Sequence, residues 1–452
     1  MKFWEKGLNP EQLRAVLTTD GAVLILAGAG SGKTKTLTHR IAYLIDEKKV
    51  NPEHILAVTF TNKAAQEMRE RIEKLLRESE AAEYGDVALP PHIGTFHNIC
   101  AKILRQEIEV LGYNRNFNII DDQDQQSIVK KTMKELEMDP DQIKPRSLLE
   151  AISKAKNSQM DPEQYMLETG SYYEELAAKV YTRYQKQLQE TNALDFDDLI
   201  ALTVKLFKDH PKVLEKYQDI FQYVMVDEYQ DTNSLQYTLV HLLAKKHGNI
   251  FVIGDDYQSI YGWRQADIRN ILNFEKDYPE AAVITLDRNY RSTQIILDAA
   301  TGVIEKNIHQ RHKKLWTDTL TGELITLCPA EDEEAEARFV AETIQEEMKK
   351  GRTASEFAVL YRTNAQSRMV EEMFLRHSIS YRIVGGLKFY QRKEIKDVIS
   401  YVKLLQNPRD ILSLERIVNE PKRGIGKATL DRWTVFSREH HLDVLEAAYQ
   451  LL

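Results

Sequence analysis

The chain has 452 residues, which is too long for a single hydrophobic core and indicates about three domains. Its composition, 42% hydrophobic and 29% charged residues, is that of a globular protein, and a net charge of −8 argues against a protein coated in positive charge. The apolar runs are too short to span a bilayer, and no apolar segment of a signal peptide is visible, so we expect a cytoplasmic protein with no membrane contact. Cys100 and Cys328 match no metal or disulfide spacing, and we expect both to be buried.

The chain begins with an alternation of predicted strands and helices. Apolar runs predict strands at residues 21–28 and 54–62. A short capped helix is predicted at 8–18, an amphipathic helix at 35–47 and a further helix at 63–79. This alternation is typical of a parallel sheet in an α/β fold. Further strands are predicted later in the chain, at residues 221–228, 248–255 and 281–287.

Between the two groups of strands, from about Gly85 to Ala193, the pattern is mostly helical. We interpret this block as an insertion within the first α/β domain, because strands resume after it. A second α/β section follows, with predicted strands at 323–330 and 356–363 around an acidic helix. The charges of that helix are most simply a solvated face. After residues 385–389 the pattern is helical again.

The segment AGAGSGKT, residues 27–34, follows an apolar strand and opens a helix, as a phosphate-binding loop does. Its small residues let backbone N–H groups turn towards an anion at a helix N-terminus. Lys33 would reach the β- and γ-phosphates of ATP, and the Thr34 hydroxyl would bind Mg²⁺. Ala27 replaces the glycine of the strict pattern, but it is small enough for the loop to close. A merely tight turn would need neither Lys33 nor Thr34. The predicted loop contacts with ATP are Gly28, Gly30, Ser31, Gly32, Lys33, Thr34 and Lys35.

Two later strands end in polar residues at what should be the same edge of the sheet. In YVMVDEYQDT, Asp227 would hold Mg²⁺ through water, and Glu228 would orient and deprotonate the attacking water. In GDDYQSIYGWRQAD, Gln258 would contact the γ-phosphate or the attacking water. The catalytic set predicted from these patterns begins with Lys33, Glu228 and Gln258.

Two aromatic residues and an arginine follow Gln258 on a loop: Tyr261, Trp263 and Arg264. One aromatic would usually be explained by core packing. Two aromatics with an arginine just beyond a strand end are better placed to stack on nucleic-acid bases, at about 1–3 kcal/mol per base.

These motifs occur in the order found in superfamily 1 DNA helicases of the UvrD/PcrA/Rep family, which the chain resembles from about residue 8 to its end. The ordered motifs are LNPEQ, AGAGSGKT, TFTNKAAQEM, GTFHNIC, VDEYQDT, GDDYQSIYGWR and LDRNYRS. A PcrA-like subgroup is the most similar, on the strength of FAVLYRTNAQSR, IVGGLKFYQRKEIKDV and PKRGIG.

The resemblance implies two RecA-like P-loop NTPase core domains with parallel sheets, each with a helical insertion, ATP between them and single-stranded DNA across them. We accordingly expect the first core domain at 1–85 and 194–285, with its helical insertion at 86–193. The first half of the second core domain is expected at 286–384, and the start of its helical insertion at 385–452.

The resemblance also assigns residues to the nucleotide. Gln12 would bond the adenine edge, and Arg40 and Tyr290 would sandwich the adenine ring. Arg291 would reach the γ-phosphate and completes the predicted catalytic set, and an arginine supplied in this way can be worth about 10³–10⁵ in rate. The alternative for Arg291 is a surface salt bridge.

On the nucleic-acid side, the resemblance implies that DNA is contacted by Phe60, Asn62, Thr95, His97, Phe196, Tyr261, Trp263 and Arg264. Phe60 also ends an apolar strand, so core packing is a serious alternative for it. The segment KRGIGK resembles a hairpin that grips a duplex phosphate, with Lys422, Arg423 and Lys427 around it, but a plain helix–helix turn is equally compatible.

Two motifs that family members carry further along, near HSAKGLEF and EERRLxYV, do not occur in this sequence. We therefore expect a C-terminally incomplete second domain without the second γ-phosphate arginine. The first hypothesis is a monomeric ATP- and Mg²⁺-dependent helicase that moves 3′ to 5′ on single-stranded DNA and at junctions with duplex, in DNA repair or replication. The alternative is an ATP-responsive DNA-binding module with little or no motor activity. A helicase–nuclease would need a nuclease domain, which these residues do not contain.

Overall fold

The protein was analysed as a computed structural model, which describes residues 2–78, 89–139, 142–307, 311, 313–384, 393–440 and 442–451. The predicted domain boundary near Gly85 and the GGLKF segment, 385–389, lie outside the described residues. The chain forms two compact units: Met1–Gly322 together with Lys403–Leu452, and Glu323–Val402.

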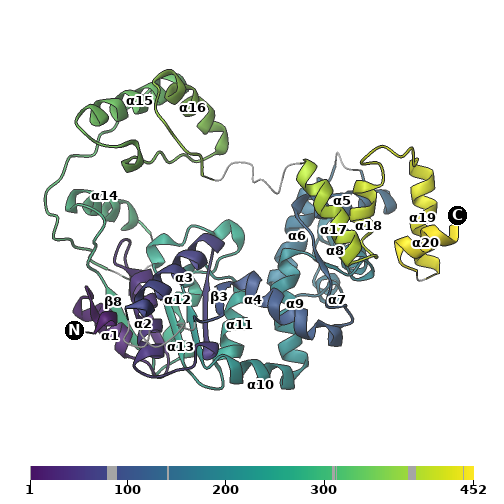
Figure 1. Ribbon diagram of the computed structural model, residues 1–452, viewed down its shortest axis with the longest axis horizontal. Helices are drawn as coiled ribbons and strands as arrows, with labels where there is room; N and C mark the ends of the chain where they lie inside the picture. Colours follow the sequence, from purple (N-terminus) through teal and green to yellow (C-terminus); the bar gives the residue numbers. More distant parts are fainter. Residues whose placement is uncertain are drawn as a thin grey trace. The chain divides into compact units, whose positions relative to one another are not determined.

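The first unit is built on a six-stranded sheet in which every pair of neighbouring strands is parallel (Figure 1). This confirms the predicted parallel α/β fold and the strands predicted at 21–28, 54–62, 221–228, 248–255 and 281–287. In spatial order the strands are β3 (His92–Thr95), β2 (Ile55–Thr59), β6 (Tyr223–Val226), β7 (Ile250–Gly254), β1 (Val23–Ala27) and β8 (Ala282–Leu286).

Helices cover both faces of this sheet, and alternate residues of each strand face the two layers. In β1, Val23 and Ile25 belong to one buried cluster with α1 (Pro10–Leu17), α2 (Lys33–Asp46) and α3 (Asn62–Arg77). Leu24 and Leu26 belong to a second cluster on the other face. The helices of that layer are α4 (Phe96–Glu107), α9 (Phe196–Asp209), α10 (Pro211–Ile220), α11 (Ser234–Ala244), α12 (Arg269–Leu272) and α13 (Phe274–Asp277).

The edge strand β3 lies inside the segment predicted as a helical insertion, 86–193. It pairs in parallel with β2, from Leu56 opposite His92 to Thr59 opposite Thr95. The strand has only four residues, and its sequence HIGT contains one large apolar side chain. Its strand conformation is therefore stabilised by the ladder to β2 and not by a run of apolar residues. The core sheet thus includes residues 92–95, which lie within the segment predicted as the insertion, and the domain boundaries themselves stay predictions.

Beyond β3 the segment is helical, as predicted, and has a buried core of its own that includes Val129, Ile152 and Tyr184. A two-stranded parallel sheet of β4 (Asn118–Ile119) and β5 (Ala193–Leu194) closes the segment. Its helices are α5 (Asp122–Glu135), α6 (Pro145–Asn157), α7 (Pro162–Leu167) and α8 (Tyr172–Glu190).

Residues 403–415 contact this helical segment within the first unit. Asn407 donates from Nδ2 to the Thr191 carbonyl at 3.2 Å, and Asn118 donates from Nδ2 to Asp410 Oδ2 at 2.6 Å. The remaining helices of the first unit and the helix that leads into residue 403 are α14 (Gln294–Ile304), α17 (Lys393–Gln406), α18 (Ile411–Ile417), α19 (Lys427–Glu439) and α20 (Val444–Leu451).

The second unit contains α15 (Glu333–Lys349), which is the predicted acidic helix, and α16 (Ser367–Arg376). The predicted strands at 323–330 and 356–363 are wrong, because neither segment is a strand in the structure. An apolar run becomes a strand only when a neighbour satisfies its backbone N–H and C=O groups, and here Leu327 and Leu360 are exposed. Cys328 is likewise exposed, against expectation, whereas Cys100 is buried as expected.

Among the helices that the structure describes, none is both long and apolar enough to cross a membrane.

Asp410 provides a test of how the C-terminal helices are attached. It caps α18 by accepting from Ser413 N at 3.0 Å, and it also accepts the Asn118 amide while buried. Asp410→Ala should lower the free energy of unfolding in urea by about 1–3 kcal/mol, because it removes a cap and leaves the amide unsatisfied. Asp443→Ala, which removes the exposed cap of α20, is the matched control and should cost about 1 kcal/mol. Equal losses would show that the Asn118 contact contributes nothing.

Candidate functional site

The loop between β1 and α2 has the backbone conformation of a phosphate cradle. Gly30 and Gly32 adopt φ angles of +65° and +86°, which favour glycine, and Ser31 donates from Oγ to the Gly28 carbonyl at 2.8 Å. The loop closes with Ala27 buried at the end of β1, as expected. Lys33 and Thr34 are the first two residues of α2 and are half-buried.

The segment after β8 lies directly on this loop. Asn289 donates from Nδ2 to the Ala29 carbonyl at 2.6 Å, and the Tyr290 amide donates to the Gly30 carbonyl at 2.9 Å. A Cβ added at Gly30 would come within 2.7 Å of Arg291 Cβ. The structure thus brings the predicted Tyr290 and Arg291 to the loop, and both side chains are exposed there.

Gln12 also lies against the loop. Its Nε2 donates to the Ser31 carbonyl at 2.8 Å, and its Oε1 accepts from the Asn9 amide, which completes a capping box at the start of α1. Asn9 in turn donates from Nδ2 to the Tyr290 hydroxyl at 3.0 Å. Three segments far apart in the sequence therefore meet around the cradle. Whether Gln12 bonds adenine stays a prediction.

Arg40 is placed differently from what stacking on a base requires. Its guanidinium is buried and donates to the carbonyls of Ala15, Thr18 and Thr19, and it lies 4.4 Å from the ring centroid of Phe251. Burial lowers the pKa of Arg40 to about 9. A stacking role would require the guanidinium to leave these carbonyls, so that role stays a prediction. Lys35, also predicted to bind ATP, donates to the Gly7 carbonyl and is half-buried.

The acidic pair after β6 faces the start of α2. Lys33 Nζ lies 3.8 Å from Glu228 Oε2, and the Asp227 amide donates to the Val58 carbonyl at 2.9 Å. Glu228 has a φ angle of +51°, a left-handed conformation that is costly for a residue other than glycine. This conformation turns the chain sharply after the buried Asp227 and places two adjacent carboxylates at the sheet edge.

The carboxylates at this edge are affected more by burial and by one another than by the neighbouring charge of Lys33. Burial and the neighbouring charge of Glu228 raise the pKa of Asp227 to about 7, although Lys33 opposes the shift. Burial and Glu228 also raise the pKa of Asp231 to about 6. A divalent cation at this edge would offset the burial and repulsion that raise the pKa values of Asp227 and Asp231. The residues therefore fit Mg²⁺, with Thr34 and Asp227 as the predicted ligands.

A chain of side-chain hydrogen bonds leads from Glu228 to Gln258. Gln230 donates from Nε2 to Glu228 Oε2 at 2.9 Å, and its Oε1 accepts from the Asp255 amide at 2.9 Å. Gln258 donates from Nε2 to Asp255 Oδ2 at 2.6 Å. The predicted Gln258 is thus connected to the acidic pair through two residues that the sequence analysis did not single out.

Lys313 and Asn289 are further site residues that the sequence analysis missed. Lys313 Nζ lies 2.7 Å from Asp255 Oδ1 and 2.5 Å from Asp256 Oδ1, and all three side chains are buried. Adjacent buried carboxylates require a cation, so the GDD sequence could have signalled that one was needed. It could not have identified Lys313, because that pairing depends on the tertiary fold.

The aromatic residues predicted to contact DNA form one cluster at the same edge. Phe60, after β2, stacks on Tyr261 with ring centroids 5.5 Å apart and planes at 21°. Tyr261 lies 6.1 Å from Trp263, and the Arg264 guanidinium lies 4.8 Å from the Trp263 ring centroid. Trp263 is 70% exposed. Phe60 therefore belongs to this half-buried surface and is not a core residue, which was the alternative for it.

His97 and Phe196 form a neighbouring pair, with ring centroids 5.5 Å apart in an edge-on arrangement. Burial and the charge of Arg264 lower the pKa of His97 to about 4, so the ring is neutral near pH 7. Thr95 uses its hydroxyl to cap α4 by accepting from Asn98 N at 3.3 Å, and Asn62 is exposed at the first position of α3. Direct DNA contacts by Thr95 and Asn62 stay predictions.

The segment KRGIGK forms the turn between α18 and α19. Arg423 donates from its guanidinium to the Ile417 carbonyl at 2.7 Å, and Asn419 brackets the turn by bonding both the amide and the carbonyl of Ile425. A role for Lys422, Arg423 and Lys427 in gripping duplex DNA stays a prediction.

Comparison with known proteins gives a consistent result. Residues 8–279 match the UvrD/REP helicase N-terminal domain, and residues 284–448 match the UvrD-like helicase C-terminal domain. The chain is 51% identical over 446 residues to the ATP-dependent DNA helicase PcrA of Bacillus subtilis (strain 168). It is 50% identical over 440 residues to the protein of the same name from Staphylococcus aureus (strain Mu50 / ATCC 700699). These alignments cover 98% and 97% of this chain but only 59% of each relative.

Asp227→Asn should stabilise the nucleotide-free protein increasingly as the pH rises from about 4 to 7. The folded-state pKa of about 7 lies above that of an unfolded aspartate, so the folded protein retains a proton that the unfolded chain releases in this window. Parental stability therefore falls with rising pH, by on the order of 1.4 kcal/mol for each pH unit between the unfolded and folded pKa values, and the neutral amide avoids this loss. Thermal unfolding at pH 5 and pH 8 measures the difference.

The exposed Asp122→Asn is the matched control and should change the free energy of unfolding by less than about 0.5 kcal/mol at either pH. Added Mg²⁺ should narrow the gap between Asp227→Asn and the parent, because a cation favours the ionised carboxylate. A gap that is the same at pH 5 and pH 8 would contradict the assignment.

Proposed function

Because the chain belongs to the UvrD/REP helicase family, we propose that it is an ATP-dependent DNA helicase or a motor portion of one. Its substrates would be ATP, single-stranded DNA and junctions of single-stranded with duplex DNA. The chain spans 59% of the length of the relatives named above, so the activity of the whole relatives is a proposal for this chain.

The observation that carries the proposal is the chain of polar contacts that leads from Lys33 in the loop after β1 to Gln258, which lies three residues before the aromatic Tyr261. Lys33 faces Glu228, Gln230 joins Glu228 to the Asp255 backbone, and Asp255 accepts from Gln258. Tyr261 and Trp263 follow Gln258 within a few residues. A change in charge at the cradle can therefore alter the position of the loop that would stack on bases.

In this proposal each predicted site residue has a defined role. Backbone N–H groups of the loop and Lys33 hold the phosphates, and Glu228 accepts a proton from the attacking water. Arg291, exposed beside Gly30, neutralises charge that develops on the γ-phosphate. Gln258 senses the γ-phosphate, and Tyr290 lies where it can cover the adenine ring. Bound Mg²⁺ would supply further neutralisation of the phosphates, with Thr34 and Asp227 holding it.

Movement from 3′ to 5′, stimulation of hydrolysis by single-stranded DNA and a role in DNA repair or replication are proposed on the strength of the family. The competing hypothesis is an ATP-responsive DNA-binding module with negligible turnover. Glu228 beside Lys33 and Arg291 beside Gly30 support the enzyme, because a binding module would need neither residue for hydrolysis. Turnover measured at saturating oligothymidine would decide between the two.

Lys33→Ala should abolish ATP hydrolysis, with a loss of at least about 10²-fold, because it removes the cation that the proposal places on the β- and γ-phosphates. Binding of fluorescein-labelled oligothymidine without nucleotide should change by less than about twofold, since Lys33 is not among the residues proposed to touch DNA. Steady-state ATPase rates and fluorescence anisotropy provide the two measurements. Retained hydrolysis would contradict the assignment of Lys33.

Trp263→Ala should weaken binding of oligothymidine by about 5–150-fold, which corresponds to about 1–3 kcal/mol for one stacked base. The DNA-independent ATPase rate should stay the same. Trp433→Ala is a matched control, because Trp433 donates from its indole to the Val444 carbonyl between α19 and α20, outside the cluster. Unchanged binding by Trp263→Ala would contradict stacking at this loop.

A further inference from the structure

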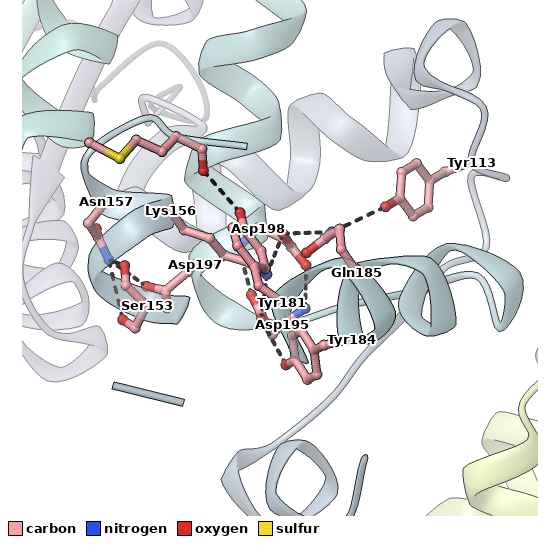
Figure 2. Close-up of polar contacts among 11 residues, drawn as sticks. Tyr113, Ser153, Lys156, Asn157, Tyr181, Tyr184, Gln185, Asp195, Asp197 and Asp198 are labelled. Atoms are coloured by element: carbon pink, nitrogen blue, oxygen red, sulfur yellow. Dashed lines mark hydrogen bonds and ion pairs between the residues drawn. The ribbon is translucent and has the colours of Figure 1, made fainter. Parts of the chain in front are cut away.

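The last turn of α6 lies against the N-termini of two other helices. Figure 2 shows Lys156 between Asp195 and Asp198, with Nζ 2.7 Å from a carboxylate oxygen of each. The side chains of all three residues are almost completely buried. Asn157, the next residue, points towards Asp197. The three aspartates belong to α9 or immediately precede it, so α6 contacts the start of α9 through consecutive side chains.

Asp195 and Asp198 also determine where α9 begins. Asp195 Oδ1 accepts from the Asp198 amide at 2.8 Å, and Asp198 Oδ2 accepts from the Asp195 amide at 3.2 Å, which is a reciprocal capping box. The first residue of the helix is Phe196, which is 50% exposed and packs on His97. The ion pairs with Lys156 hold the capping residues of α9 in place. They therefore fix the start of the helix, from which the Phe196 ring extends to the surface.

Asn157 links the same helix start to the acidic loop. Its Nδ2 donates to Asp197 Oδ1 at 3.0 Å, and its Oδ1 accepts from Asn233 Nδ2 at 2.7 Å. Asn233 caps α11 by accepting from the Gln236 amide at 3.0 Å. Asn233 follows directly on the Asp227–Thr232 segment that carries the acidic pair. Gln159 adds a third contact by donating to the Thr238 hydroxyl on α11 at 3.0 Å.

We propose that Lys156 and Asn157 are positioning residues that hold Phe196 in register with the acidic loop, so that this side chain contributes to DNA-dependent stimulation of hydrolysis. The inference rests on the proposed function. A contact that served only to keep the helices folded would stabilise them equally with and without DNA. A contact that sets the position of Phe196 affects the DNA concentration needed for stimulation while leaving the DNA-independent rate unchanged.

Asn233→Ser is the most selective test, because serine keeps a capping oxygen for α11 but lacks the amide that reaches Asn157. The loss of one buried hydrogen bond predicts about a fivefold rise in the oligothymidine concentration that gives half-maximal ATPase stimulation. The maximal rate and the DNA-independent rate should stay within about twofold of the parent. Asn51→Ser, at the cap of the turn Pro52–His54, is the matched control and should behave as the parent does.

The same substitution in a Phe196→Ala background tests whether the effect runs through Phe196. Non-additivity is expected, so Asn233→Ser should change the half-maximal concentration by less than about twofold when the ring is already absent. A full fivefold effect in that background, or no effect in the parental background, would overturn the inference while leaving the proposed function intact. A parental chain that shows no stimulation by oligothymidine would overturn the proposed function itself, and the inference with it.

Discussion

Parallel strand pairing is the constraint on which the rest of the structure depends. Because all six strands run in one direction, every loop that follows a strand emerges at the same edge of the sheet. The strand order then distributes these loops along the edge, with the phosphate cradle after β1, the acidic pair after β6 and the aromatic Phe60 after β2. The loop after β7 contacts both the acidic loop and Phe60, since the Asp255 amide donates to Gln230 and Tyr261 stacks on Phe60.

Buried cations secure the elements that surround this edge. Lys313 pairs with Asp255 and Asp256, Lys156 pairs with Asp195 and Asp198, and Arg40 donates to carbonyls at the end of α1. Buried ion pairs add little net stability compared with apolar packing, but an unpaired member would be strongly destabilising. Loss of either partner would therefore be expected to disturb the elements that the pair joins. In this protein each pair fixes a segment that carries a proposed site residue.

Sequence patterns predicted what local chemistry determines. The apolar runs of β1 and β7, the glycine-rich loop and the capped start of α1 were all anticipated, because each depends on residues adjacent in the chain. The missed features depend on partners elsewhere: β3 exists because β2 satisfies its backbone, and residues 323–330 lack such a neighbour. Asn289 and Lys313 have no local signature, and the burial of Arg40 follows from carbonyl groups more than 20 residues away. The domain boundaries and the roles of the individual site residues stay predictions.

The contact between Gly28 and Leu315 has a consequence for how the sequence can vary. A Cβ added at Gly28 would lie 2.1 Å from Leu315 Cδ2, so the absence of a side chain at position 28 makes room for an apolar group from a distant segment. Position 28 is therefore constrained by the fit of this leucine as well as by any role that the loop has in holding phosphate. A side chain at position 28 would require Leu315 to change rotamer or to be replaced by a smaller residue. Positions 28 and 315 are thus coupled by steric contact, although they are far apart in the sequence.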